Sequence, residues 1–333
     1  MHVLQLASGN KSRSLLPDDT LARIAERAAE LKTAVNPPVP ATIQATLRPY
    51  QLEGFHFLAY LTANTFGGIL ADDMGLGKTL QTLVWLASLR EDETLAKRAS
   101  LVVCPKSVTD NWLSESERFY PSLKVGVWRD KNATRLSSFV KNHDLIVLNY
   151  SQLRSHEIAL ANVEWLTVIL DEGQFIKNPS SQTAQAARNL VADHRLILTG
   201  TPIENKLLDL WSLMSFAMPG ILGTQGRFQV LFNEKKDALA TRRLAARVRP
   251  FLLRRSKKEV ATDLPDRIEE DLHCEMEGDQ LHRYRAELKI ARQRLLKINT
   301  SKQLDKERFN ILTSLLRLRQ ICAHPGLAEW PCG

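Results

Sequence analysis

Short apolar runs alternate with segments of helical periodicity through the middle of the chain. The runs are Gly68–Ala71, Leu101–Cys104, Val125–Trp128, Leu145–Leu148, Leu166–Leu170 and Leu196–Leu198. Several are apolar at consecutive positions, as expected for strands that are buried on both faces. Because strands that alternate with helices form crossover units, the pattern predicts an α/β fold, with a parallel sheet covered by helices on both faces. Ligands of such sheets bind at the carboxyl ends of the strands.

The two ends of the chain differ from this middle part. Leu21, Ile24 and Ala28 recur at helical spacing, and a proline-rich stretch over 36–40 ends that pattern, which predicts an N-terminal helical flank. After Pro219 the strand signal fades. From there the pattern predicts a basic helical region, a linker, one short strand and two helices: 227–258, Leu264–Asp266, Glu270–Cys274, Gln280–Lys297 and Lys302–Ala323.

A glycine-containing loop follows the first apolar run and opens a helix. It reads Asp72-Asp73-Met74-Gly75-Leu76-Gly77-Lys78-Thr79, and the helical run Leu80–Leu89 comes next. A strand, a Gly-Lys-Thr loop and a helix in this order are typical of a phosphate-binding P-loop, although Asp72 stands where the general pattern has Gly. Backbone N–H groups of such a loop converge on phosphate oxygens. We expect Lys78 to reach the β- and γ-phosphates and the Thr79 hydroxyl to ligate Mg²⁺.

Two further strands end in polar residues that suit phosphoryl transfer. The run Leu166–Leu170 ends in Asp171 and Glu172, where one carboxylate would hold Mg²⁺ and the second would orient and activate the attacking water. We assign the metal to Asp171 and the water to Glu172. The run Leu196–Leu198 ends in Thr199-Gly200-Thr201, whose hydroxyls would hydrogen-bond the acidic pair, although an ordinary turn explains that tripeptide nearly as well.

Taken in order, the motifs resemble those of the Swi/Snf helicase-like ATPases of helicase superfamily two. The matching stretches are Leu47–Gln51, Asp72–Thr79, Val103–Ser107, Asp171–Gln174, Leu198–Asn205, Phe251–Lys258, Leu264-Pro265 and Leu318–Pro325. The resemblance covers about 46–325 and implies a RecA-like P-loop NTPase fold with a mainly helical C-terminal extension. It implies three parts: an N-terminal flank (1–45), an ATP-binding lobe (46–250), and a linker with the helical start of a second lobe (251–333).

The resemblance also implies roles for single residues. Residues that would contact ATP are Arg48 and Gln51 near the adenine, and Asp72, Asp73, Met74, Gly75, Leu76, Gly77, Lys78 and Thr79 around the phosphates. Residues that would couple the nucleotide to the grip on DNA are Gln174, Thr199, Gly200 and Thr201. Residues that would lie along the DNA backbone are Lys106, Ser107, Asn149 and Tyr150. Contacts of this last kind carry little sequence information.

The chain departs from the family pattern at two points. The fourth residue of the acidic box is Gln174 where the family usually has His, and an amide can still donate and accept hydrogen bonds. The rest of the second lobe, which supplies arginine fingers, is missing from this sequence. Arginine fingers contribute about 10³–10⁵ in rate to phosphoryl transfer. We therefore expect weak or no ATPase activity from this chain alone.

Charge and composition say less about the partners and the compartment of the protein than the motifs do. The 333 residues include 45 Lys and Arg against 37 Asp and Glu, a net charge of +8, which permits a nucleic-acid partner without requiring one. A basic cluster comprises Arg242, Arg243, Arg247, Arg249, Arg254, Arg255, Lys257 and Lys258; contact with DNA or with the second lobe and a solvated surface explain it equally well. The four cysteines form no C-x-x-C pair, which favours a reducing compartment.

These observations lead to one main hypothesis and two alternatives. The main hypothesis is the ATP-binding lobe of a double-stranded DNA translocase, a DNA-stimulated ATPase that uses ATP and Mg²⁺. Its expected partners are duplex DNA, a second RecA-like lobe in cis or in trans, and RNA polymerase or another DNA-bound complex. The first alternative is a non-hydrolysing module that binds ATP or DNA and recruits partners. In the second, the motor moves on RNA or on a complex of nucleic acid and polymerase. We expect no membrane association, and a location in the bacterial cytoplasm or nucleoid, or in a eukaryotic nucleus.

Overall fold

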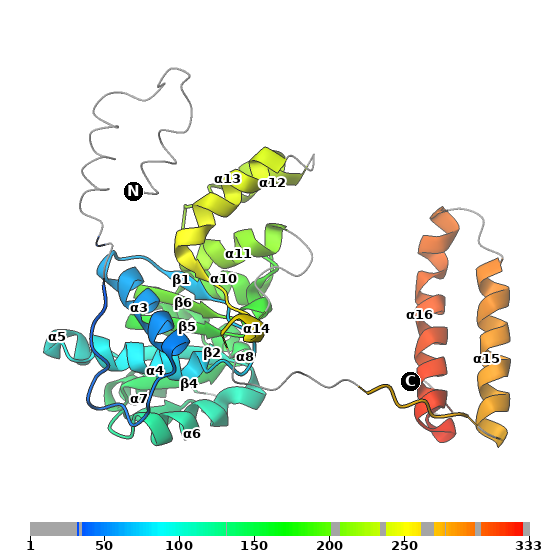
Figure 1. Cartoon of the computed structure of the whole chain (residues 1–333), viewed down its shortest axis with the longest axis horizontal. Helices are drawn as coiled ribbons and strands as arrows, with labels where there is room; N and C mark the ends of the chain where they lie inside the picture. The colour runs from blue at the N-terminus through cyan, green and yellow to red at the C-terminus, as the bar shows by residue number, and fades with distance from the viewer. Residues whose placement is uncertain are drawn as a thin grey trace, which may run out of the picture. The chain divides into compact units, whose positions relative to one another are not determined.

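Figure 1 shows a computed structural model of the chain, which divides into two compact units at Leu264 and Pro265. The structure describes residues 32, 35–130, 132–200, 207–233, 238–260, 270–276, 278–296 and 301–328. The helical pattern predicted around Leu21–Ala28 and the linker predicted at Leu264–Asp266 lie outside these residues.

Unit 1 is built on a seven-stranded sheet in which every neighbouring pair of strands is parallel. The strand order is β3-β4-β2-β5-β6-β1-β7. The strands are β1 Gly68–Leu70, β2 Ser100–Cys104, β3 Val125–Val127, β4 Leu145–Asn149, β5 Glu164–Asp171, β6 Val191–Leu198 and β7 Leu252–Leu253. All six apolar runs of the sequence lie in or overlap strands β1 to β6, so these predictions are confirmed.

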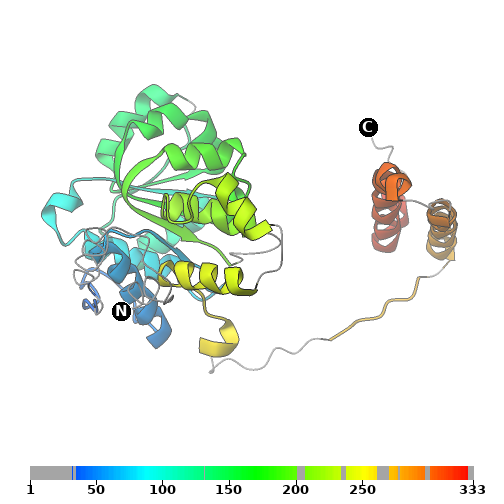
Figure 2. The same cartoon turned by 90° about the horizontal axis from the view of Figure 1, so that it is seen from above.

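Helices cover both faces of this sheet, as Figures 1 and 2 show. One group consists of α3 (Pro49–Ala63), α4 (Lys78–Leu89) and α6 (Thr109–Phe119), and the other of α8 (Tyr150–Ser155), α10 (Gln182–Asn189) and α11 (Leu207–Ala217). Further helices are α5 Glu93–Ala96, α7 Leu136–Asn142, α9 Glu157–Ala161, α12 Gln225–Asn233, α13 Ala238–Val248 and α14 Lys257–Val260. Short 3₁₀ turns are η1 Lys106–Val108, η2 Ala133–Arg135, η3 Gly173–Ile176 and η4 Arg249–Phe251.

The hydrophobic core lies between the sheet and these helices. From one face α4 buries Leu83 and Leu86, and from the other α11 buries Leu213 and Phe216. Full burial of a side chain of this size contributes about 1.5–3 kcal/mol. The core therefore fixes the sheet rigidly, and with it the polar residues at the strand ends.

In the C-terminal half, the helical prediction for 227–258 holds only in part, and the strand predicted at Glu270–Cys274 was wrong. The stretch 227–258, predicted as helical, contains β7, which pairs with Ile69 and Leu70 of β1. The predicted boundary after residue 250 therefore falls inside unit 1, because β7 belongs to its sheet. Glu270–Cys274, predicted as a strand, is irregular, because no strand pairs with it within the described residues.

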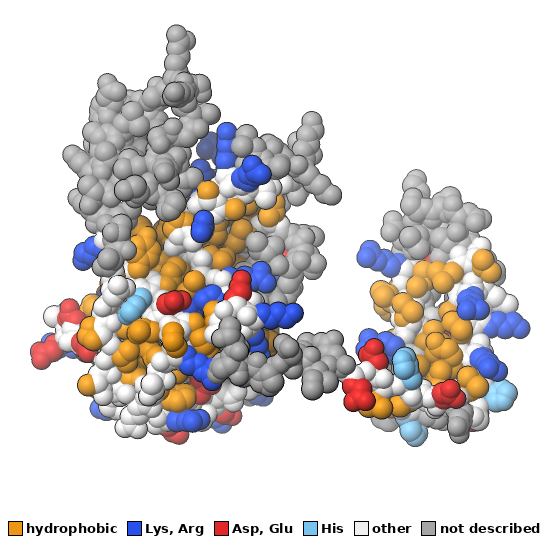
Figure 3. Space-filling model, viewed as in Figure 1, with side chains coloured by type: hydrophobic (Ala, Val, Ile, Leu, Met, Phe, Trp, Pro, Cys, Tyr) orange, Lys and Arg blue, Asp and Glu red, His pale blue; other side chains and the backbone are white. Residues whose placement is uncertain are grey.

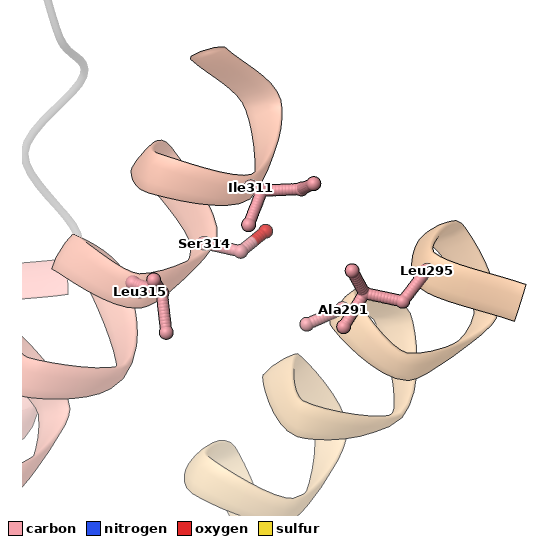
Figure 4. A pocket seen from close by; sticks show the side chains of 5 residues that line it. All are labelled: Ala291, Leu295, Ile311, Ser314 and Leu315. Carbon is pink, nitrogen blue, oxygen red and sulfur yellow. The ribbon is translucent and has the colours of Figure 1, made fainter. Parts of the chain in front are cut away.

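Unit 2 contains a pair of helices, α15 (Gly278–Leu296) and α16 (Ser301–Ala323), followed by the 3₁₀ turn η5 Pro325–Ala328. Both helices were predicted from their periodicity and are confirmed. Figure 4 shows a small apolar gap of about 40 Å³ between them, lined by Ala291, Leu295, Ile311, Ser314 and Leu315. The gap holds no titratable side chain, so it is a packing defect rather than a place for chemistry. No helix in the described parts of the chain is long and apolar enough to cross a membrane.

Candidate nucleotide-binding site

The strand order brings three polar strand ends to one edge of the sheet. β1, β6, β5 and β2 are neighbours in the order β2-β5-β6-β1. In the register of the sheet, Asp171 at the end of β5 lies beside Leu198 of β6, which lies beside Leu70 of β1. The phosphate loop after β1, the acidic pair at the end of β5 and Thr199 after β6 therefore meet, as the strand-end rule predicts.

The loop between β1 and α4 has the backbone conformation of a phosphate cradle. Gly75 and Gly77 have φ angles of +83° and +76°, a region that side chains with a Cβ rarely adopt. A Cβ on Gly77 would also come within 2.5 Å of the Gln51 amide nitrogen. Backbone N–H groups that donate to no described residue are those of Gly75, Gly77, Lys78, Thr79 and Leu80. These donors lie at the N-terminus of α4, where the helix dipole favours an anion.

Lys78 begins α4 and folds back over this loop. Its Nζ donates to the backbone carbonyls of Asp72 at 2.7 Å and Asp73 at 3.3 Å. Burial lowers the pKa of Lys78, and the nearby carboxylates, with Glu172 and then Asp171 the strongest, oppose this shift. The ammonium is therefore held between the loop and the acidic pair, where a nucleotide phosphate would take over its hydrogen bonds.

Asp171 is buried at the end of β5, and hydrogen bonds fix both of its carboxylate oxygens. Oδ2 accepts from the Trp112 indole at 2.9 Å and Oδ1 accepts from the backbone N–H of Glu172 at 2.9 Å. The Tyr150 hydroxyl donates to the Asp171 backbone carbonyl at 2.7 Å. Burial raises the pKa of Asp171, and the indole hydrogen bond opposes the rise. Each oxygen keeps a lone pair that a metal or its water ligand can use.

Glu172 lies in a strained turn directly after Asp171. Its φ angle is +53°, an uncommon value for a residue other than Gly. Its Oε2 accepts from the Gln174 amide at 2.9 Å, and the Gln174 carbonyl oxygen accepts from the Thr199 hydroxyl at 3.4 Å. A Cβ on Gly200 would lie 3.3 Å from Cγ of Met74, so this segment also approaches the phosphate loop. The acidic pair and the end of β6 are thus joined through Gln174.

Sequence reasoning missed Glu115, a further carboxylate of this site. Burial raises the pKa of Glu115, and the nearby Thr79 side chain opposes the rise. Glu115 lies on α6 one turn after Trp112, so one helix reaches both Thr79 and Asp171. The spacing Trp-x-x-Glu was the available signal, because residues three apart share a helix face. Trp112 itself is completely buried.

The predicted adenine residues lie at the back of the loop. Gln51 is buried, donates to the Leu76 carbonyl at 3.3 Å and accepts from the backbone N–H of Arg48 at 3.0 Å. Arg48 is exposed. Gln51 therefore supports the loop, and its contact with adenine stays a prediction.

Asp72 directs its side chain away from the loop into the protein. It is completely buried, and Oδ1 accepts from Nε of Arg255 at 3.0 Å and from the Arg255 backbone N–H at 3.1 Å. Arg255 also reaches the Tyr50 carbonyl and, at 3.0 Å, the Gln81 side chain. Of the basic cluster, Arg255 is buried and the other members are exposed. Figure 3 shows Lys and Arg side chains over α13 and around α14.

The residues predicted to contact DNA separate into two groups. Lys106 and Asn149 line an open groove of about 830 Å³ at the ends of β2 and β4, and Ser107 is exposed beside Lys106. Tyr150 does not join them: it is buried, with its ring stacked on Phe175 at 4.7 Å and its hydroxyl on the Asp171 carbonyl. The structure therefore gives Tyr150 a supporting role under the acidic pair. Thr201 lies outside the described residues.

The residues present fit a magnesium-bound nucleoside triphosphate. The free N–H groups of the loop and Lys78 suit a polyphosphate. The Thr79 hydroxyl and the Asp171 carboxylate are oxygen ligands of the kind that Mg²⁺ takes, and Mg²⁺ usually keeps several waters as well. A fold of this kind with this loop and acidic pair defines a P-loop nucleotide-binding domain.

The chain belongs to the SNF2-related domain family, whose model matches residues 50–327. It is 38% identical over 320 residues to the TATA-binding protein-associated factor MOT1 of Saccharomyces cerevisiae, covering 88% of this chain and 17% of that protein. It is 38% identical over 283 residues to an uncharacterized ATP-dependent helicase of Mycoplasma pneumoniae, covering 84% of this chain and 27% of that protein. The chain thus spans less than a third of these relatives.

A solved structure supports the same assignment. The SWI2/SNF2 ATPase core of Sulfolobus solfataricus in complex with dsDNA matches with a TM-score of 0.63 and 38% identity, over 87% of this chain and 61% of that one. The fold is therefore the RecA-like α/β fold of SNF2 ATPase cores, and the resemblance found in the sequence is confirmed.

Proposed function

We propose that this chain is the ATP-binding lobe of a motor that moves on double-stranded DNA and couples ATP hydrolysis to that movement. The observation that carries the proposal is the hydrogen-bonded connection from Glu172 through Gln174 to Thr199, beside a loop built to bind phosphates. A carboxylate held in this way can orient a water for attack on a terminal phosphate. A motor also requires that the change in bonding at the terminal phosphate reach the residues that hold DNA. Gln174 and Thr199 would transmit this change.

The residues of the site would divide the work as follows. The loop N–H groups and Lys78 bind and align the phosphates, and Glu172 takes the proton of the attacking water. Thr79 and Asp171 would hold Mg²⁺, which neutralises charge that develops on the phosphate oxygens. Trp112 and Tyr150 hold Asp171 in place through hydrogen bonds at 2.9 and 2.7 Å.

Duplex DNA would bind along the groove that contains Lys106 and Asn149. Two carboxylates in its lining are already paired, Asp110 with Arg129 at 2.7 Å and Asp130 with Arg135 at 3.3 Å, which leaves Lys106 to attract a phosphate. The Sulfolobus SWI2/SNF2 core supports this proposal because its structure contains dsDNA. Contacts to the backbone alone would let the motor move without regard to sequence.

The whole protein would act on a complex that is already bound to DNA. The name of the yeast relative associates it with TATA-binding protein, which supports a DNA-bound protein as the target. Such work would place the protein in the nucleus of a eukaryote or the nucleoid of a bacterium. A second RecA-like lobe, in the same protein or in a partner, would complete the ATP site with arginine fingers.

ATP binding and hydrolysis by the chain, with and without duplex DNA or RNA, test the proposal. We expect binding of Mg-ATP that Lys78→Ala removes. We also expect slow hydrolysis that duplex DNA but not RNA stimulates severalfold. Glu172→Gln should lower that hydrolysis by about 10²-fold or more while nucleotide still binds.

Other outcomes of these experiments would support other functions. DNA binding without ATP binding would support a recruitment module and contradict the motor. Fast hydrolysis by the chain alone would show that it completes its own site. Stimulation by RNA would make RNA the track.

A further inference from the structure

A short segment that follows α13 and η4 runs beside the phosphate loop. We call residues Leu252–Lys257 the strap. Its strand β7 pairs with β1, and the hydrogen bonding continues past the end of both strands. The Ala71 N–H donates to the Leu253 carbonyl at 2.7 Å, and the Asp73 N–H donates to the Arg255 carbonyl at 3.1 Å. The first residues of the loop therefore use the strap as their partner strand.

Side chains of the loop hold the strap in return. Arg255 and Asp72 form the buried ion pair described above, with two hydrogen bonds to Asp72 Oδ1 at 3.0 and 3.1 Å. The Asp73 carboxylate accepts from the Lys257 backbone N–H at 3.0 Å. The backbone of Lys257 is thus fixed against the loop even though its side chain is exposed.

The Lys257 side chain folds over the glycine of the loop. Its Nζ and Cε lie 3.4 and 3.5 Å from the position that a Cβ on Gly75 would take. No carboxylate among the described residues forms an ion pair with this ammonium. Lys78 is bonded to carbonyls of the same loop, so two lysines lie against one set of free N–H groups.

We propose that Lys257 is a second phosphate-binding lysine of the nucleotide site. An ammonium that pairs with no described carboxylate gains a charged partner when a polyphosphate binds to the loop beside it. Charge-assisted hydrogen bonds of this type are roughly twice as strong as neutral ones. The site also contains the carboxylates of Asp73, Asp171 and Glu172, which makes an additional cation valuable for an anionic ligand. The proposal needs only nucleotide binding by the loop, and not movement on DNA.

The chain supplies a matched control in Lys258, the next residue, which is also exposed. Binding of ATPγS with Mg²⁺ would be measured by calorimetry for the full chain and for Lys257→Ala, Lys257→Arg and Lys258→Ala. We expect Lys257→Ala to weaken binding about tenfold, which corresponds to about 1.4 kcal/mol. Lys258→Ala should stay within twofold, and Lys257→Arg should keep most of the affinity.

A footprint on the unaltered chain gives a second readout. Lysine acetylation by a water-soluble reagent would be mapped by mass spectrometry with and without ATPγS and Mg²⁺. The proposal expects nucleotide to protect Lys257 severalfold and to leave Lys258 unchanged. Equal labelling of Lys257 in both states, or equal losses of affinity in Lys257→Ala and Lys258→Ala, would overturn it.

Discussion

His194 lies in β6 as a buried imidazole. Burial lowers its pKa, with Asp193 opposing the shift, and its Nδ1 finds no hydrogen-bond partner among the described residues. Its ring packs edge-on against Trp85 at 6.3 Å between centroids. The folded protein therefore keeps a neutral His194 at pH values where the unfolded chain would bind a proton.

The sign of the resulting pH effect follows from linkage. Because the unfolded state binds the proton more readily, stability falls as the pH decreases below the ordinary histidine value of about 6.5, by at most about 1.4 kcal/mol per unit. We expect the urea midpoint of unfolding to fall less in His194→Phe than in the parent protein when the pH is lowered from 7.5 to 5. Urea unfolding at both pH values measures this. An equal fall of the midpoint in the variant and the parent would contradict this expectation.

Glu115 offers a test within the nucleotide site itself. The Thr79 side chain beside it opposes the rise that burial causes in its pKa, so Glu115 would be an outer partner of a metal that the Thr79 hydroxyl binds. Loss of such an outer partner typically lowers metal affinity about 10–100-fold. We expect Glu115→Gln to raise the Mg²⁺ concentration needed for ATPγS binding by that factor. The matched control is Glu117→Gln, an exposed position on α6. If both variants need the same Mg²⁺ as the parent, Glu115 has no such role.

Among the elements, α3 ends in a Schellman motif whose left-handed position is occupied by Thr65, a residue with a Cβ. The Phe66 N–H donates to the Leu61 carbonyl at 2.8 Å and the Thr65 N–H donates to the Thr62 carbonyl at 2.9 Å, the two bonds of a Schellman motif. Thr65 occupies the left-handed position, with φ of +54°. A residue with a Cβ costs about 1–2 kcal/mol there. We expect Thr65→Gly to stabilise the protein by about 1 kcal/mol in urea unfolding, whereas Thr65→Ala should give little gain.

The strap is the element whose attachment depends most on one ion pair. Arg255→Ala would leave Asp72 charged and without its partner in a completely buried position. Breaking a buried pair in this way costs about 3–5 kcal/mol, whereas apolar replacement of both partners is often neutral. We expect Arg255→Ala to be strongly destabilising in urea unfolding and the double variant Arg255→Met with Asp72→Leu to recover much of the loss. A double variant as unstable as the single one would contradict this account.

Elements with a long apolar pattern were predicted well, and short ones were not. β1 to β6 each contain or overlap a predicted run, because strands that are buried on both faces must be apolar at consecutive positions. β7 has two residues and lies between helices, so no periodicity could identify it. Glu270–Cys274 shows the converse: its local pattern favours a strand, but a strand also needs a neighbour to pair with.

At the scale of the whole molecule, every described residue assigned to the nucleotide site lies in unit 1, before Leu264. We therefore expect a chain that ends at Leu264 to bind ATPγS with an affinity within about twofold of the full chain. A chain that ends at Val248 lacks the strap and is the control; it should lose both stability and binding. Calorimetry and thermal unfolding measure these two quantities. Loss of binding on truncation at Leu264 would show that unit 2 contributes to the site.

The sequence by itself determined the class of the protein and the edge of the sheet where its chemistry lies. The apolar runs specify parallel strands, and three of them are followed by the phosphate loop with Lys78, by Asp171 and Glu172, and by Thr199. Such features are local, because buried strands, helix starts and glycine loops each depend on a few neighbouring residues. The match to the SNF2-related family confirms the resulting assignment.

Only the tertiary structure decided which side chains support these residues. Arg255 meets Asp72 across 183 positions, and Trp112 meets Asp171 across 59. Both pairings depend on strand order and on how each crossover helix packs, which no local pattern contains. The structure likewise shows that Tyr150, predicted to contact DNA, is buried, and that Lys257 lies beside the phosphate loop. A charge run in the sequence does not distinguish a buried arginine from an exposed lysine, because burial is set by packing.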